Sequence, residues 1–219
     1  MIIIKSDQEI DIMRTAGKVT AEILEKLESF IKPGVSTMDI DRFVEEFIRK
    51  KEMVPSFKGL YDFPASACVS VNEEVVHGIP SEKRTLQEGD IVSVDTGATY
   101  KGYVSDAART YGVGTISPEA RHLIDTARDS FFEGLKFCKV GYRLSDISHA
   151  IQEKVESEGF GVIRDFVGHG VGRDMHEDPQ IPNFGAPGRG PRLAKGMVFA
   201  IEPMITQGSY EVETLLDNW

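Results

Sequence analysis

The stretch Asp90-Ile-Val-Ser-Val-Asp-Thr-Gly-Ala-Thr-Tyr-Lys-Gly-Tyr-Val-Ser-Asp106 decides what we expect of this chain's fold and chemistry. Two acids, Asp95 and Asp106, each end an apolar run, and the turn signal Lys101-Gly102 lies between the runs. This pattern predicts a β-hairpin. A turn near residues 100 and 101 would set the two acids opposite each other, whereas a turn at 101 and 102 would set them one diagonal apart on the same face.

Either register makes Asp95 and Asp106 neighbours. Two carboxylates side by side repel each other and lose hydration, so a fold keeps them together only with a cation or a shared proton. For either acid alone, a strand end that faces water or caps a turn would be the ordinary explanation. Their pairing, with apolar neighbours on both strands, favours a binding site, and a divalent metal is the usual occupant.

Length, composition and charge limit what the chain can do. Its 219 residues, 41% of them apolar, suffice for one large domain or two small ones. A net charge of -10 and a pI near 5.0 argue against specific nucleic-acid binding, which needs clustered Lys and Arg. Only Cys68 and Cys138 are present, which fits a reducing cytoplasm, and no apolar run reaches the length of a signal core or a membrane span. We therefore expect a cytoplasmic protein without a membrane or nucleic-acid partner.

Helical periodicity predicts a scaffold of amphipathic helices. The first begins after Ser6 and ends before Lys32-Pro33-Gly34, and the second begins near Ser36 or Thr37. Two more are expected from Ser117-Pro118 onward and from about Leu144 to Glu158, the latter capped by Ser145. None of these helices carries residues to which we assign chemistry.

Polar residues that suit catalysis gather in the last third of the chain. His169 stands among three glycines in Gly168-His-Gly-Val-Gly172, which permit close approach of the backbone, and His176 follows seven residues later. Glu202 interrupts the buried-looking strand predicted over 196–205, where an acid is costly unless it is paired or bound to a cation. His77 lies between an apolar run and a glycine turn. A single histidine is usually structural, so we consider His77 a candidate only because the other polar residues are present.

Asp95, Asp106, His169 and Glu202 together combine hard oxygen ligands with one imidazole. Such a set suits Mn, Fe, Co or Zn in a catalytic site that keeps positions open for water.

The motifs that carry these residues resemble the methionine aminopeptidases, in the short bacterial-like form without an N-terminal zinc-binding extension. The resemblance covers essentially the whole chain and rests on six motifs in the right order. They are VHGIP at 76–80, SVDTGA at 93–98, SDAART at 105–110, GHGVG at 168–172, MHEDPQIPNFG at 175–185 and AIEPM at 200–204.

The resemblance implies an α+β pita-bread fold, as in creatinase and the aminopeptidases, with a pseudo-two-fold antiparallel sheet flanked by helices. Residues 1–219 would form a single catalytic domain around a pair of divalent metal ions, which in the family are Co, Mn, Fe or Zn. Asp95 and Asp106 would be ligands, with Asp106 bridging, and His169 and Glu202 would complete the tighter position. His77 would contact the substrate at the scissile peptide, and His176 would stabilise the oxyanion of the tetrahedral intermediate.

In the family, a pocket for the methionine side chain forms around residues that match Phe57, Leu60, Phe63, Cys68, Met175 and Trp219. Cys68 and Trp219 match the family, whereas Phe57, Leu60 and Met175 differ from the residues of well-known bacterial relatives. The family pattern also continues past the Trp with a strand that bears a second bridging Glu, whereas this sequence ends at Trp219. We therefore expect a truncated gene product that lacks an edge strand and holds its second metal weakly.

The activity implied is removal of N-terminal Met from nascent polypeptides whose second residue is small, by attack of a metal-activated water. The enzyme would act as a monomer, and contact with the ribosome is left open. A proline-specific aminopeptidase of the same fold is the alternative within enzymes, although such proteins usually carry an extra N-terminal domain. A catalytically impaired pita-bread protein that binds peptides is the alternative outside them.

Overall fold

The computed structural model describes residues 1–216, which group into two compact units. The N-terminal unit comprises Asp7–Ala120 and Gly172–Met175, with residues 215 and 216. The C-terminal unit comprises Met1–Ser6, Arg121–Val171 and His176–Thr214. Along residues 1–216, every helix is too short or too polar to cross a bilayer.

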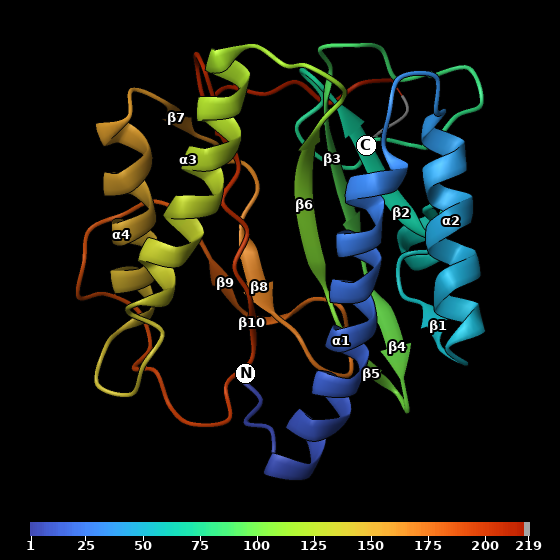
Figure 1. The fold of residues 1–219 in the computed structure, drawn as a ribbon. Helices are drawn as coiled ribbons and strands as arrows, with labels where there is room; N and C mark the ends of the chain where they lie inside the picture. Colours follow the sequence, from blue (N-terminus) through green and yellow to red (C-terminus); the bar gives the residue numbers. More distant parts are fainter. Residues whose placement is uncertain (217–219) are drawn as a thin grey trace. The chain divides into compact units, whose positions relative to one another are not determined.

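The N-terminal unit packs two helices on one face of an antiparallel sheet (Figure 1). Helices α1 (Asp7–Phe30) and α2 (Thr37–Lys50) cover strands β2 (Ala67–Val71), β3 (Ile91–Thr96) and β6 (Ala107–Gly112), in the order β2-β3-β6. The α2 helix begins where the sequence predicted, and its capping box, in which Ser36 and Asp39 exchange hydrogen bonds, is a finding of the structure. Apolar side chains at helical spacing meet alternate strand residues and form the core, which includes Ile23, Leu27, Ile40, Val92 and Val94.

The predicted hairpin forms, with the turn at Lys101 and Gly102. Both turn residues have positive φ, 48° and 77°, as the mirror-image turns that suit a hairpin's twist require. Asp95 lies opposite Ala108, so Asp106 is one diagonal away from it on the same face. The second of the two predicted registers is therefore confirmed.

The hairpin divides between two sheets. Its tip, β4 (Ala98–Tyr100) and β5 (Tyr103–Val104), joins β1 (Val54–Pro55) in a separate sheet of order β1-β4-β5. A short 3₁₀ helix, η1 (Leu60–Asp62), lies between β1 and β2 in the chain. This break leaves Asp106 between β5 and β6 rather than inside a strand.

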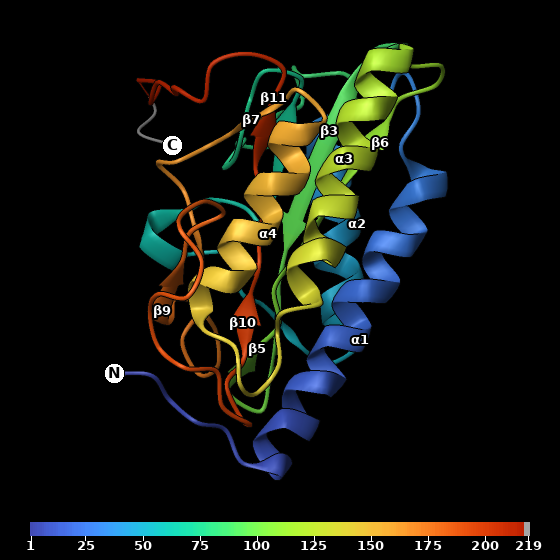
Figure 2. The same cartoon turned by 90° about the vertical axis from the view of Figure 1, so that its left-hand side faces the viewer.

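In the C-terminal unit, helices α3 (Pro118–Leu135) and α4 (Leu144–Ser157) lie side by side (Figure 2). Strands β8 (Gly168–Gly170), β9 (Glu177–Ile181) and β10 (Phe199–Ala200) form an antiparallel sheet of order β10-β8-β9. Strands β7 (Gly161–Val162) and β11 (Ile205–Thr206) pair separately. The core of this unit includes Ile147, Ile151, Val155, Val162 and Ile181.

Two local predictions for this unit are wrong. The strand expected over 196–205 is two short strands, β10 and β11, and Glu202 lies between them. Pro203 has no amide hydrogen to donate to a ladder, which explains the interruption. Ser145 does not cap α4, because its hydroxyl binds the backbone of Arg189, and Asp146 instead accepts the amide hydrogen of Arg143.

Asp41 ties helix α2 to the start of β2. Its Oδ1 accepts the amide hydrogens of Ser66 and Ala67 at 2.7 Å and 2.9 Å, and the residue is 6% exposed. Burial raises the pKa of Asp41 above its usual value, although the two amide hydrogen bonds oppose the rise. Because the folded-state pKa is the higher one, ionisation of Asp41 costs folding free energy as the pH rises from about 4 towards neutrality.

We predict that Asp41→Ala lowers the free energy of unfolding by about 2–4 kcal/mol, because it leaves two buried amides without an acceptor. Asp41→Asn keeps an oxygen acceptor and removes the ionisable group, so at pH 7 it should stay within about 1 kcal/mol of the wild type. Urea unfolding of the three proteins measures both differences. Equal losses for the two variants would contradict the assigned role of Oδ1.

Candidate functional site

The two acids of the hairpin lie on one face of the N-terminal unit beside Cys68. Asp95 and Asp106 are both half-buried, and Cys68 of β2 pairs directly with Asp95 of β3. Burial, and then the charges of these two acids, raise the pKa of the Cys68 thiol. Cys68 is therefore a protonated, nearly apolar side chain at neutral pH, and it is unsuited to act as a nucleophile.

His77 adopts a backbone conformation that residues other than glycine seldom occupy, with φ of 59°. The following Gly78 binds the edge of β2: its carbonyl accepts the amide of Val69, and its own amide donates to Ser70 Oγ. Burial lowers the pKa of His77, which makes the neutral imidazole its form at pH 7. A strained backbone position of this kind costs about 1–3 kcal/mol and is often found at functional sites.

The residues predicted to line the methionine pocket lie in the N-terminal unit as far as they are described. Phe57, Leu60 and Phe63 share one tight loop, in which the amide of Leu60 donates to Phe57 and that of Phe63 to Leu60. Phe57, Phe63, Cys68 and Met175 are buried, and Leu60 is half-buried. Trp219 lies outside the described residues.

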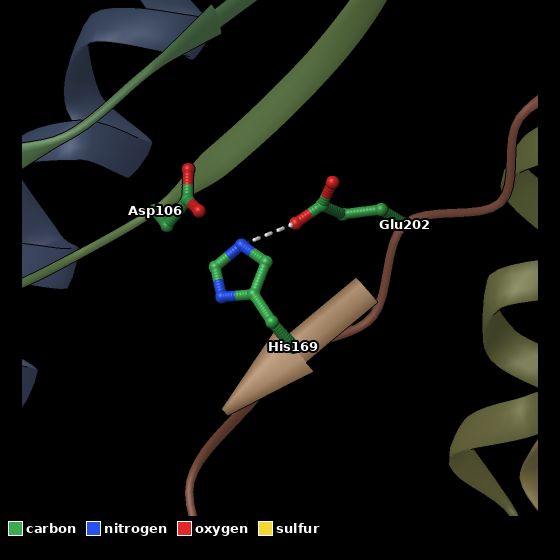
Figure 3. A group of neighbouring side chains, drawn as sticks. All are labelled: Asp106, His169 and Glu202. Carbon is green, nitrogen blue, oxygen red and sulfur yellow. Dashed lines mark ion pairs between the residues drawn. The ribbon is translucent and has the colours of Figure 1, made fainter. Parts of the chain in front are cut away.

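His169 and Glu202 meet in the C-terminal unit. His169 is the middle residue of β8 and pairs with Ala200 of β10, so Glu202, two residues further on, lies diagonally across from it. A side chain at Gly168 would bring its Cβ to 2.3 Å from the Ala200 carbonyl oxygen, which explains why a glycine precedes the histidine. His169 Nε2 lies 3.1 Å from Glu202 Oε1 (Figure 3).

The tautomer of His169 follows from its other ring nitrogen. Nδ1 lies 2.9 Å from the carbonyl oxygen of Gly170, which can only accept, so Nδ1 carries the hydrogen. In the neutral ring, Nε2 then presents a lone pair towards Glu202 Oε1, a buried oxygen that accepts no hydrogen bond from the described residues. Two acceptors at this distance require a proton or a cation between them.

His176 completes the polar group of the C-terminal unit. It directly precedes β9, and its ring packs edge-on against that of His169, with centroids 4.4 Å apart. Unlike His169, which is 8% exposed, His176 is exposed. The exposed imidazole of His176 can therefore reach a bound molecule. The buried imidazole of His169 has only Nε2 with which to bind a metal ion.

The donors suit a divalent metal ion. A neutral imidazole nitrogen and carboxylate oxygens are ligands of the first-row transition metals, and an ion would satisfy both acceptors of the His169–Glu202 pair. Asp95 and Asp106 of the N-terminal unit are donors of the same class.

One residue in this region received no role from the sequence. Asn183, which is fully buried, donates from Nδ2 to the backbone carbonyl of Glu202 at 2.6 Å. Its place in the motif at 175–185 was its only signal, because a hydrogen bond to a residue 19 positions away has no local pattern.

Comparison with known proteins agrees with this chemistry. Residues 11–216 match the model of metallopeptidase family M24. The chain is 58% identical to a methionine aminopeptidase of Clostridium acetobutylicum over 219 residues, which cover the whole chain and 88% of that protein.

Solved structures share the fold. A methionine aminopeptidase of Thermotoga maritima superposes with a TM-score of 0.98 at 49% identity, over 100% of this chain and 88% of its own. A Xaa-Pro dipeptidase of Bacillus anthracis reaches 0.79 at 29% identity, over 91% of this chain and 54% of its own. Both matches confirm the predicted pita-bread fold, with its helices and antiparallel sheets. From its motifs, its fold and these relatives, the chain belongs to metallopeptidase family M24, among the methionine aminopeptidases.

Proposed function

We propose that this protein removes N-terminal methionine from polypeptides whose second residue is small, in a reaction that depends on a divalent metal. The observation that carries the proposal is the His169–Glu202 pair, in which two acceptors face each other at 3.1 Å. Similarity to methionine aminopeptidases over the whole chain supports the choice of substrate.

We propose that Asp106, His169 and Glu202 hold one ion and that Asp95 and Asp106 contribute to a second, with Asp106 shared. Their oxygen and imidazole donors suit Co, Mn, Fe or Zn. The bound metal would lower the pKa of a water molecule and polarise the substrate carbonyl. Because the donors come from both units, we also propose that the two units act as one catalytic domain.

The remaining residues would orient the substrate. We assign His77, neutral at pH 7 because of its lowered pKa, to a hydrogen bond at the scissile peptide. The exposed His176 would donate a hydrogen bond to the developing oxyanion. Stabilisation of this charge is usually the largest single contribution to the rate of peptide hydrolysis. Phe57, Phe63 and Cys68 would enclose the methionine thioether, whose polarisable sulfur favours aromatic and thiol neighbours. Leu60, Met175 and Trp219 are assigned to the same pocket.

We also propose a cytoplasmic location, where nascent polypeptides are made. Both cysteines are free thiols, which fits a reducing compartment. A proline-specific activity remains the alternative, although identity to the Xaa-Pro dipeptidase is only 29%, against 58% to the clostridial methionine aminopeptidase.

A peptide assay distinguishes these activities. The metal-loaded protein is incubated with Met-Ala-Ser, Met-Leu-Ser and Ala-Pro-Ala, and the free amino acids are measured. We expect release of Met from Met-Ala-Ser alone, because a branched second residue is bulkier than alanine. Cleavage before proline would favour the alternative, and the absence of turnover on all three peptides would favour a peptide-binding role.

Loss of a proposed ligand should strongly weaken metal binding. Substitution of a residue that hydrogen-bonds to a metal ligand lowers metal affinity by about 10- to 100-fold. Substitution of a ligand itself should lower it further, so we expect His169→Ala or Glu202→Gln to lower the affinity by at least about 100-fold, with a parallel loss of Met release. Titration with Co²⁺ measures the affinity. His149→Ala is the matched control, since His149 lies on α4 and pairs with Glu153 at 3.5 Å. Wild-type affinity in the Glu202 variant would refute its assignment.

Cys68→Ser tests the pocket. A hydroxyl in place of the buried thiol makes the wall more polar, so kcat/KM for Met-Ala-Ser should fall by roughly 10-fold, mainly through KM. Cys138→Ser, at the chain's other cysteine, should leave both constants unchanged. Steady-state kinetics of the two variants measures kcat and KM. Equal effects of the two substitutions would contradict the assignment of Cys68 to the pocket.

A further inference from the structure

Asn183 holds the backbone of the proposed ligand Glu202. Its side chain Nδ2 lies 2.6 Å from the Glu202 carbonyl oxygen, and the residue is 0% exposed. A carbonyl oxygen only accepts hydrogen bonds, so the amide nitrogen must be the atom that faces it.

The segment that carries Glu202 needs such a contact. Glu202 lies between β10 and β11, outside both strands, and the following Pro203 has no amide hydrogen with which to join a ladder. No backbone–backbone hydrogen bond holds the Glu202 carbonyl within the described residues. Without Asn183, the position of the Glu202 backbone would depend on the two short strands at either side and on the hydrogen bond from the Ile163 amide to the Met204 carbonyl.

Asn183 also links this segment to the strand that positions His169. It follows β9 by two residues, and within β9 Gln180 pairs with His169 of β8. His169 and Asn183 are therefore both held by the sheet that contains β8 and β9. Because Asn183 in turn binds the Glu202 carbonyl, this contact defines the position of Glu202 relative to His169.

Burial alone does not explain an asparagine here. Its Oδ1 is buried and has no hydrogen-bond partner among the described residues, which costs free energy that an apolar side chain would not. The favourable contribution of an asparagine at this position therefore comes from its N–H group and not from its oxygen.

We propose that Asn183 is a positioning residue that fixes Glu202 against His169 and so sets the affinity and ligand geometry of the metal site. This inference rests on the proposed function. A purely structural role would affect stability alone, whereas a positioning role affects the metal as well.

Gln152 provides a matched control. Its Oε1 accepts the amide hydrogen of Gly185 at 2.8 Å, so it too is a side-chain amide that holds a backbone group in this unit. Gly185 is two residues from Asn183 in sequence, but it carries no ligand.

The test compares Asn183→Leu and Gln152→Met with the wild-type protein. Co²⁺ binding is followed by visible absorption, which reports the ligand geometry, and thermal unfolding of the metal-free proteins reports stability. We expect Co²⁺ affinity to fall by about 10- to 100-fold in Asn183→Leu, with an altered spectrum. Gln152→Met should keep the wild-type affinity and spectrum. If the leucine variant does not fold, Asn183→Asp, which keeps the shape but lacks the N–H, should show the same loss.

Three results would overturn the inference. Wild-type affinity and spectrum in the Asn183 variants would leave Asn183 a purely structural residue while the proposed function stands, as would equal losses in Asn183→Leu and Gln152→Met. Failure of the wild-type protein to bind Co²⁺ at all would instead contradict the proposed metal site, and the inference with it.

Discussion

The contact between His169 Nε2 and Glu202 Oε1 is the constraint on which the site of the C-terminal unit depends. The Gly170 carbonyl holds the hydrogen on Nδ1, and this leaves two acceptors facing each other at 3.1 Å. Such a pair is unfavourable unless a positive charge lies between the two atoms. The close approach at Gly168 and the hydrogen bond from Asn183 both maintain it.

Strand register also places the proposed site residues of the N-terminal unit, although the strands that carry them are short. Asp95 and Asp106 share a face because the hairpin turns at Lys101 and Gly102. A shift by one residue would turn one of them to the opposite face. Pairing of β2 with β3 brings Cys68 beside Asp95, so a proposed pocket residue and a proposed ligand occupy opposite positions on neighbouring strands.

Burial adjusts the chemistry of the groups that are not ligands. It lowers the pKa of His77 and raises that of Cys68, so both are neutral at physiological pH. A neutral imidazole can donate one hydrogen bond and accept another without repelling a nearby metal ion. A protonated thiol suits the proposed apolar pocket and would not compete for a metal ion.

The sequence by itself indicated the helices, the hairpin and the residues with metal-binding chemistry, because hydrophobic period and turn residues are local properties, and the fold class followed from the resemblance of its motifs to a known family. Tertiary structure alone chose between the two hairpin registers, ended the strand before Glu202 and fixed the tautomer of His169. It also revealed the contact between Asn183 and Glu202. These features depend on hydrogen bonds and close backbone approaches between residues distant in the chain, such as Gly168 with Ala200, and hydrophobic periodicity carries no information about them.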